Sequence, residues 1–135
     1  MGTNIHGYVE INPIKESDAD VWLVVIDIGS VVEQDYRVFA RLFGVRVKQQ
    51  HAILADHRGL PTDSVNHRQH HITLSEDVVH HSWVTWQEIN DFMPQHLDLD
   101  VELWGWHWVF NSMQTLAARF GAENVRLVVA FDNYG

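Results

Sequence analysis

The sequence contains no cysteine, few basic residues and no long apolar run. The lack of cysteine excludes disulfide bonds, thiolate zinc sites and a cysteine nucleophile. The longest apolar run, from Val21 to Ile26, is far shorter than the roughly 20 residues that a helix needs to span a bilayer. The 18 acidic residues outnumber the 9 basic ones, and the net charge is −9. We therefore expect neither a long nucleic acid nor a membrane as a partner.

What is present is typical of one folded domain. Apolar residues make up 46% of the 135 residues and charged residues 20%, a balance that disfavours disorder. We expect a single domain, residues 1–135, that buries roughly two thirds of the surface exposed by the unfolded chain. Since no basic segment followed by an apolar one opens the sequence, we expect no signal peptide and a cytoplasmic location.

The start of the sequence predicts a β-hairpin. Ile5–Ile11 and Val21–Ile28 have the apolar patterns of two strands, the second with Trp22, Val24 and Ile26 on one face. The segment between these strands is polar and short enough to join them in antiparallel order.

A helix and a long loop are expected next. Asp35 is a candidate N-cap, and Gly44 is placed to end the helix in a left-handed conformation. From Gln49 to Val79 the sequence is irregular and polar, which predicts a loop longer than the roughly 12–15 residues at which unstructured connections become uncommon.

The next elements carry a clear helix-start signal. Ser82–Val84 predicts a short edge strand, and Thr85 with Glu88 has the T-x-x-E spacing of a capping box. We expect Pro94 to end the helix that begins there.

The last elements are a helix and a strand. Glu102–Phe120 carries apolar residues at helical spacing, and Val125–Phe131 alternates as a strand does. The predicted fold class is α+β: a small, mostly antiparallel sheet of three or four strands, with two or three helices packed on one face and a long polar loop.

Ten histidines exceed all lysines and arginines together, and four of them form two pairs, His70-His71 and His80-His81. Histidine is both a common metal ligand and a side chain that changes charge near neutral pH. A zinc site is one alternative, with three ligands drawn from His6, His70, His71, His80, His81 and Asp132. No H-E-x-x-H or H-x-H spacing supports it, so no metal site is assigned.

Short motifs along the chain carry a resemblance. The motifs are Met1–His6, Asp35–Ala40, R-G-L-P-x-D-S at Arg58–Ser64, H-S-W-x-T at His81–Thr85, Arg126–Val128 and F-D-N at Phe131–Asn133. In type and order they resemble a family of small phage and prophage proteins that open with M-G-x-D-I-H. The resemblance implies a phage context, in the host cytoplasm, and a shared set of polar residues rather than an activity. Asn4 stands where the family pattern has aspartate, and a neutral amide cannot act as a base.

The polar residues at the ends of the predicted elements are expected to form one site. If the first and last strands are neighbours, His6 and Asp132 share one rim of the sheet, where binding residues on loops also gather. The predicted ligand-binding residues are His6, Tyr36, Arg37, Arg58, Asp63, Ser64, His81, Ser82, Trp83, Asp132 and Asn133.

The function predicted from these residues is that of a phage-type accessory protein, in counter-defence or host takeover. It would bind a small anionic ligand, of which a nucleotide is one candidate, or a host protein. Arg37 and Arg58 would hold the anion by forked hydrogen bonds, His6 and His81 would donate hydrogen bonds, and Trp83 would stack on the ligand.

Two alternatives remain open. One is a hydrolase, such as a phosphoesterase, in which His6 or His81 is the general acid or base and Asp63 or Asp132 orients it. The other is a protein-binding module or homo-oligomer that uses the acidic surface and the tryptophans near residue 106 as an interface. The sequence does not identify a cofactor.

Overall fold

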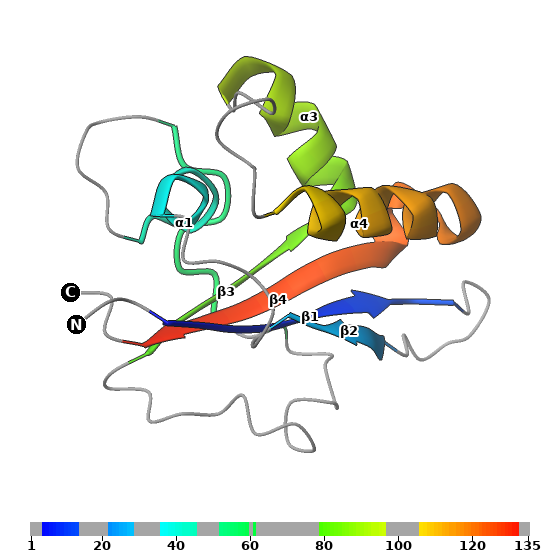
Figure 1. The fold of residues 1–135 in the computed structure, drawn as a ribbon, viewed down its shortest axis with the longest axis horizontal. Coiled ribbons are helices and arrows are strands. Elements are labelled where there is room, and N and C mark those ends of the chain that lie inside the picture. The colour runs from blue at the N-terminus through cyan, green and yellow to red at the C-terminus, as the bar shows by residue number, and fades with distance from the viewer. Residues whose placement is uncertain are drawn as a thin grey trace.

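In the computed structural model, which describes residues 4–13, 22–28, 36–45, 52–59, 61, 79–96 and 106–132, four strands form one sheet with helices on one face (Figure 1). The elements in chain order are β1 (Asn4–Ile11), β2 (Leu23–Asp27), α1 (Tyr36–Phe43), β3 (Val79–Thr85), α3 (Trp86–His96), α4 (His107–Phe120), the 3-10 turn η1 (Ala122–Asn124) and β4 (Val125–Asp132). The predicted α+β class is confirmed. None of the described helices is long and apolar enough to cross a membrane.

The sheet has the order β2-β1-β4-β3, and all its pairs are antiparallel. β4 lies in the middle, between β1 and β3, so the first and last described strands are neighbours, which was the condition for His6 and Asp132 to share one rim of the sheet. Every residue from Val125 to Phe131 is buried. This strand is apolar on almost all positions because it is covered on both faces and paired on both edges.

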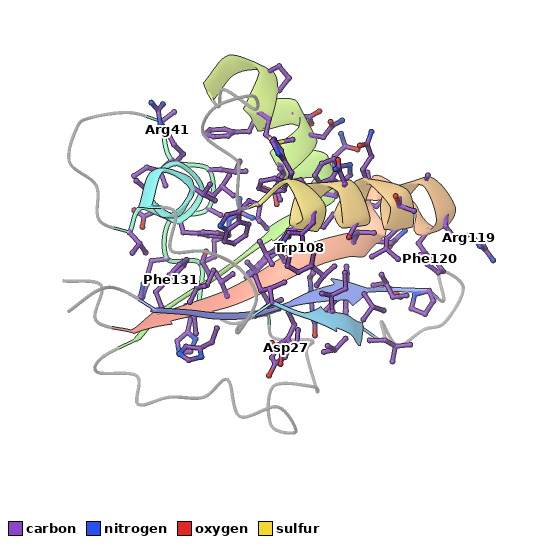
Figure 2. The ribbon with its side chains drawn as sticks, viewed as in Figure 1. Asp27, Arg41, Trp108, Arg119, Phe120 and Phe131 are labelled. Atoms are coloured by element: carbon purple, nitrogen blue, oxygen red, sulfur yellow. The ribbon has the colours of Figure 1, made fainter. Side chains whose placement is uncertain are left out.

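The main core lies between the sheet and the helices. Alternate residues of the sheet face this layer, and Phe131 of β4 meets Phe43 of α1 with ring centroids 5.5 Å apart. Figure 2 shows Phe131 on the helix side of the sheet and Asp27 on the other side. The residues that fill the core from the helices, and from the position just before α4, include Val38, Leu42, Ile89, Met93, Trp106, Val109 and Met113. The two faces of the sheet therefore differ: one packs on helices and the other, called the far face below, does not.

The prediction that Trp22, Val24 and Ile26 share one face is wrong. The register between β1 and β2 shifts after Val9, so that Val24 packs against the far-face cluster and Ile26 against the main core. The shift leaves Val25 as an extra residue in β2. An extra residue of this kind, a β-bulge, interrupts the alternation of faces, and apolar patterning does not reveal it.

Local signals at the helix ends are confirmed. Thr85 and Glu88 form the capping box: Glu88 N donates to Thr85 Oγ1 at 3.2 Å, and Thr85 N donates to Glu88 Oε1 at 3.2 Å. Gly44 and Gly121 follow α1 and α4 with φ of 72° and 99°, in the region that favours glycine.

Two helix boundaries differ from the predictions. Pro94 does not end α3, which continues to His96, because Met93 is buried in the core and tertiary packing outweighs the missing N–H of proline. α4 begins at His107, directly after Trp106, and Glu102, where this helix was expected to begin, lies outside the described residues.

Candidate ligand-binding site

The far face brings two of the predicted histidines together across the sheet. His6 of β1 and His81 of β3 are both register partners of Ala130 in β4. We call these three residues the histidine row. Because adjacent strands lie about 4.8 Å apart, the two histidine backbones are separated by roughly 10 Å. The central strand contributes only a methyl group between the two imidazoles, so the row combines two nitrogen-bearing rings with a small middle residue.

An aromatic row lies beside the histidine row. Tyr8, Val128 and Trp83 are register partners across β1, β4 and β3, and Tyr8 also faces Asp27 of β2. Burial, and then the negative charge of Asp27, raise the pKa of the Tyr8 phenol above its ordinary value. The phenol therefore keeps its proton at neutral pH and can donate a hydrogen bond. Two imidazoles, a phenol and an indole thus occupy adjacent positions of one face.

These side chains have little contact with water. Ala130 and Val128 are fully buried, His81 is 8% exposed and Tyr8 7%, whereas His6 and Trp83 are half-buried. A charged group held among them would be partly removed from water. Hydrogen bonds to it would be stronger there than in water, because the dielectric constant of the protein interior is lower. The same burial is also compatible with a packing role for His81, and the two roles differ in what its removal would change.

A buried ion pair, which the sequence analysis missed, lies further along the same face. Arg126 Nε is 2.8 Å from Glu10 Oε1, and the two residues are 3% and 0% exposed. The Trp22 ring covers the guanidinium, with 3.8 Å between Arg126 Cζ and the ring centroid. The signal available in the sequence was a charged residue in each of two mainly apolar strands, Glu10 in the first and Arg126 in the last. The pair fixes β1 against β4 next to the two rows.

Arg58 does not have the open position expected of an anion clamp. Its Nη1 donates to Glu88 Oε1 at 2.8 Å and its Nη2 to Glu88 Oε2 at 2.6 Å, a forked pair. Nη1 also donates to the Trp83 carbonyl and Nη2 to the Leu54 carbonyl, at 3.3 and 3.2 Å. Both terminal nitrogens therefore already bind oxygen atoms of the protein. Arg58 ties the segment before it to β3 and α3, and its guanidinium lies 5.0 Å from the Trp83 ring centroid.

Ser82 is also engaged in structure rather than placed with His81. Its hydroxyl donates to the Ala55 carbonyl and accepts a hydrogen bond from Arg58 N at 3.2 Å. Adjacent residues of a strand point to opposite faces, so Ser82 and His81 cannot serve one site on the far face. The H-S-W motif by itself does not show that His81 and Ser82 point to opposite faces. The alternation of side chains along a strand predicts it.

The other predicted residues are placed in part or not at all. Tyr36 and Arg37 belong to α1, on the helix side, so the sheet separates that helix from the histidine row. Asp132 ends β4 opposite Asn4, two positions beyond Ala130, and only its backbone is described. Asp63, Ser64 and Asn133 lie outside the described residues.

No metal centre is evident in the part of the chain that the structure describes. Within it, no group of three or more histidine, aspartate or glutamate side chains lies close enough to hold a metal ion. His70 and His71 are outside this part, and the side chains of His80 and Asp132 are not described. The zinc alternative therefore stays untested.

The geometry is suited to binding a small group by hydrogen bonds from two sides and by stacking. Imidazole N–H groups from β1 and β3, the Tyr8 phenol and the Trp83 ring can each contribute one contact. Comparisons of the chain with protein-family models, curated proteins and solved structures gave no match, so the interpretation of this site rests on its geometry.

Proposed function

We propose that this chain is a phage-type accessory protein that binds a small anionic, nucleotide-like ligand in the host cytoplasm. The histidine row is the observation that carries the proposal. His6 and His81 come from distant parts of the sequence and meet on either side of Ala130. By binding such a ligand, the protein would act in counter-defence, because it would withhold a small signalling molecule of the host.

The contacts that support this proposal come from the two adjacent rows. An anionic group between His6 and His81 would accept hydrogen bonds from both imidazoles. A planar group attached to it would lie over the aromatic row, where the Trp83 ring can stack. Arg58 lies 5.0 Å from that ring and would act by holding Trp83 rather than by binding the anion, which changes the role first expected of it.

A hydrolase is the second candidate. It is favoured by the position of Asp132, which follows Ala130 by two residues, the spacing at which residues of a strand share a face. In that case His6 or His81 would be the general acid or base, with Asp132 orienting it. The two functions differ in their product: a binding protein releases the nucleotide intact, whereas a hydrolase releases it cleaved.

The test is calorimetric titration of the protein with a panel of cyclic and linear nucleotides. After incubation, the protein is denatured and the released nucleotide is examined by chromatography. A nucleotide that binds and returns intact supports withholding of the ligand, and a cleaved one supports hydrolysis. Failure of every member of the panel to bind would contradict both.

The histidine row makes a specific prediction for His81→Ala. Loss of one hydrogen bond to a charged group, about 1.5–3 kcal/mol, should weaken ligand binding by roughly 10-fold to 150-fold. His107→Ala is the matched control, because His107 is an exposed histidine of α4 on the helix side of the sheet. We expect this control to bind as the unaltered protein does.

Stability separates a binding role from a packing role. Urea denaturation of His81→Ala should show a free energy of unfolding within about 1 kcal/mol of the unaltered protein. A loss above about 2 kcal/mol with unchanged ligand affinity would assign His81 to the packing of the far face and remove it from the site.

A further inference from the structure

A pocket lies between β2 and α4, on the helix side of the sheet and away from the histidine row. Its volume is about 430 Å³, within the range of roughly 300–1,000 Å³ that is typical of sites for small molecules. Three of its lining side chains are apolar, three can form hydrogen bonds, and none carries a charge. The lining residues are Val25, Ile26, Asn111, Ser112, Thr115 and Leu116.

The bulge in β2 builds one wall of this pocket. Neighbouring residues of a regular strand point to opposite faces, so Val25 and Ile26 would not be expected to line the same pocket. The extra residue at Val25 breaks this alternation, and both side chains line it. Bulges are over-represented at sheet edges and next to active sites, where they re-aim a side chain. In β2 the result is an apolar wall that faces α4.

The opposite wall carries three hydrogen-bonding side chains of α4, Asn111, Ser112 and Thr115, which we call the polar strip. The Thr115 hydroxyl donates to the Asn111 carbonyl of its own helix at 3.0 Å, so it offers the pocket an acceptor and no donor. The side chains of Asn111 and Ser112 form no hydrogen bond with another described residue. The Asn111 amide presents a donor and an acceptor side by side. A ligand that uses the whole strip must therefore both donate and accept.

An exposed tryptophan lies beside the polar strip. Trp108 is 37% exposed and belongs to α4, as Figure 2 shows. It precedes Asn111 and Ser112 by three and four positions, the spacing of neighbours on one helix face. An indole in this position can stack on a flat ring that enters the pocket.

We propose that this pocket, called the β2–α4 pocket below, binds a small uncharged aromatic molecule that carries a donor and an acceptor side by side. The ring lies against the apolar wall and under Trp108, and its polar edge binds the polar strip. A charged molecule is disfavoured, because no lining side chain compensates for the water it would lose. The net charge of −9 further disfavours an anion. The ligand class therefore differs from the anionic one proposed for the far face.

The test is titration of isotope-labelled protein, followed by amide NMR spectra, with three probes of one shape: benzamide, acetophenone and benzoate. Benzamide has both the donor and the acceptor, acetophenone lacks the donor, and benzoate carries a negative charge. Benzamide at millimolar concentration should shift the signals of Val25, Ile26 and residues 111–116. It should bind at least about threefold more tightly than acetophenone, the effect expected of one uncharged hydrogen bond. Benzoate should bind more weakly than either.

The positions of the shifted signals separate this site from the far face. Signals of His81 and Trp83 should stay in place during the benzamide titration, and they should move with a nucleotide that binds the histidine row. Failure of one site therefore leaves the test of the other intact.

Two natural sources share the proposed chemistry, nucleobases and aromatic carboxamides. Adenine offers a donor and an acceptor to an asparagine amide through N6 and N7, and nicotinamide does so through its carboxamide. Both are titrated in the same way as benzamide. Tighter binding of adenine assigns the pocket to a nucleobase, and tighter binding of nicotinamide assigns it to a carboxamide.

Asn111→Leu removes one amide of the polar strip and should weaken benzamide binding by about threefold to tenfold. Gln114→Leu is the matched control, because it removes the same group at an exposed position of α4 that does not line the pocket. We expect this control to bind as the unaltered protein does. Trp108→Ala should weaken benzamide and acetophenone alike, since stacking does not depend on the polar edge.

Three results would overturn the proposal. The first is that benzamide, up to its solubility limit, shifts no signal of the pocket. The second is that benzoate binds as tightly as benzamide. The third is equal binding of benzamide by Asn111→Leu and Gln114→Leu, each shown by circular dichroism to be folded. If Asn111→Leu fails to fold, the comparison of Trp108→Ala with Gln114→Leu decides.

Discussion

Glu10→Ala should lower the free energy of unfolding by about 3–5 kcal/mol, the cost typical of removing one partner from a buried ion pair. The Arg126 guanidinium is 3% exposed and lies 2.8 Å from the Glu10 carboxylate. Without Glu10 this charge would remain between strands with its anion removed. The Trp22 ring above it offers a cation–π contact but cannot neutralise it. Urea denaturation at neutral pH measures the effect through the midpoint and slope of the transition.

Two controls separate charge burial from general damage to the sheet. Glu123→Ala removes an exposed carboxylate and should change stability by less than about 0.5 kcal/mol. The double variant Glu10→Leu with Arg126→Met replaces the pair by apolar side chains and should recover most of the lost stability. A Glu10→Ala loss below about 1 kcal/mol would contradict the role given to this pair.

Arg58→Ala should lower the free energy of unfolding by about 1.5–3 kcal/mol, because hydrogen bonds to the charged carboxylate of Glu88 are lost. Both carboxylate oxygens of Glu88 accept from this guanidinium, at 2.8 and 2.6 Å. Arg58→Lys should restore little, since an ammonium group cannot form the fork. Arg119→Ala, at an exposed position of α4, is the control and should cost less than about 1 kcal/mol.

The same variant also tests the function first expected of this arginine. A loss of stability in Arg58→Ala supports the structural role. Unchanged stability together with abolished ligand binding would instead return Arg58 to the anion site.

The ion pair between Arg58 and Glu88 also predicts that the stability of the fold depends on pH. The hydrogen bond from Arg58 lowers the pKa of Glu88 in the folded protein, against the opposing effect of partial burial. A carboxylate with a lowered pKa stabilises the fold at pH values above its unfolded pKa, about 4.3, and this contribution is lost as the pH falls through the folded pKa. The stability difference between the unaltered protein and Glu88→Gln should therefore be constant from pH 7 to about 5 and shrink below about 4. Urea denaturation across this pH range measures it, and a difference that grows on acidification would contradict the assignment.

Interactions between residues close in sequence could be predicted. The Thr85–Glu88 capping box and the glycine after α1 depend on spacings of a few residues, and both are present. The strand Val125–Phe131 was also predicted, because apolar residues recur at every second position, and the structure places these residues, Val125, Leu127, Val129 and Phe131, in the main core. The pairing of the first and last strands was a hypothesis about topology that the register confirms.

Interactions between distant residues could not be predicted from spacing. Glu10 and Arg126 are partners only because β1 and β4 pair in one particular register. Glu88, the partner of Arg58, lies 30 residues further along the chain, on α3. Of the candidate site, the sequence identified His6, His81 and Trp83 but not Tyr8, which reaches the far face through its position two residues after His6.

The place of β4 in the sheet has a consequence for synthesis on the ribosome. β4 is the last of the described strands to be made, yet β3 pairs with no other described strand and β1 with only one other, β2. Until β4 emerges, one edge of β1 and one edge of β3 are without β4, the strand with which both pair in the folded protein. Pairing across such long sequence separations is slow. In that interval we expect the unpaired edges of β1 and β3 to stay exposed, and folding of the sheet to be completed only after Val125–Asp132 has left the exit tunnel.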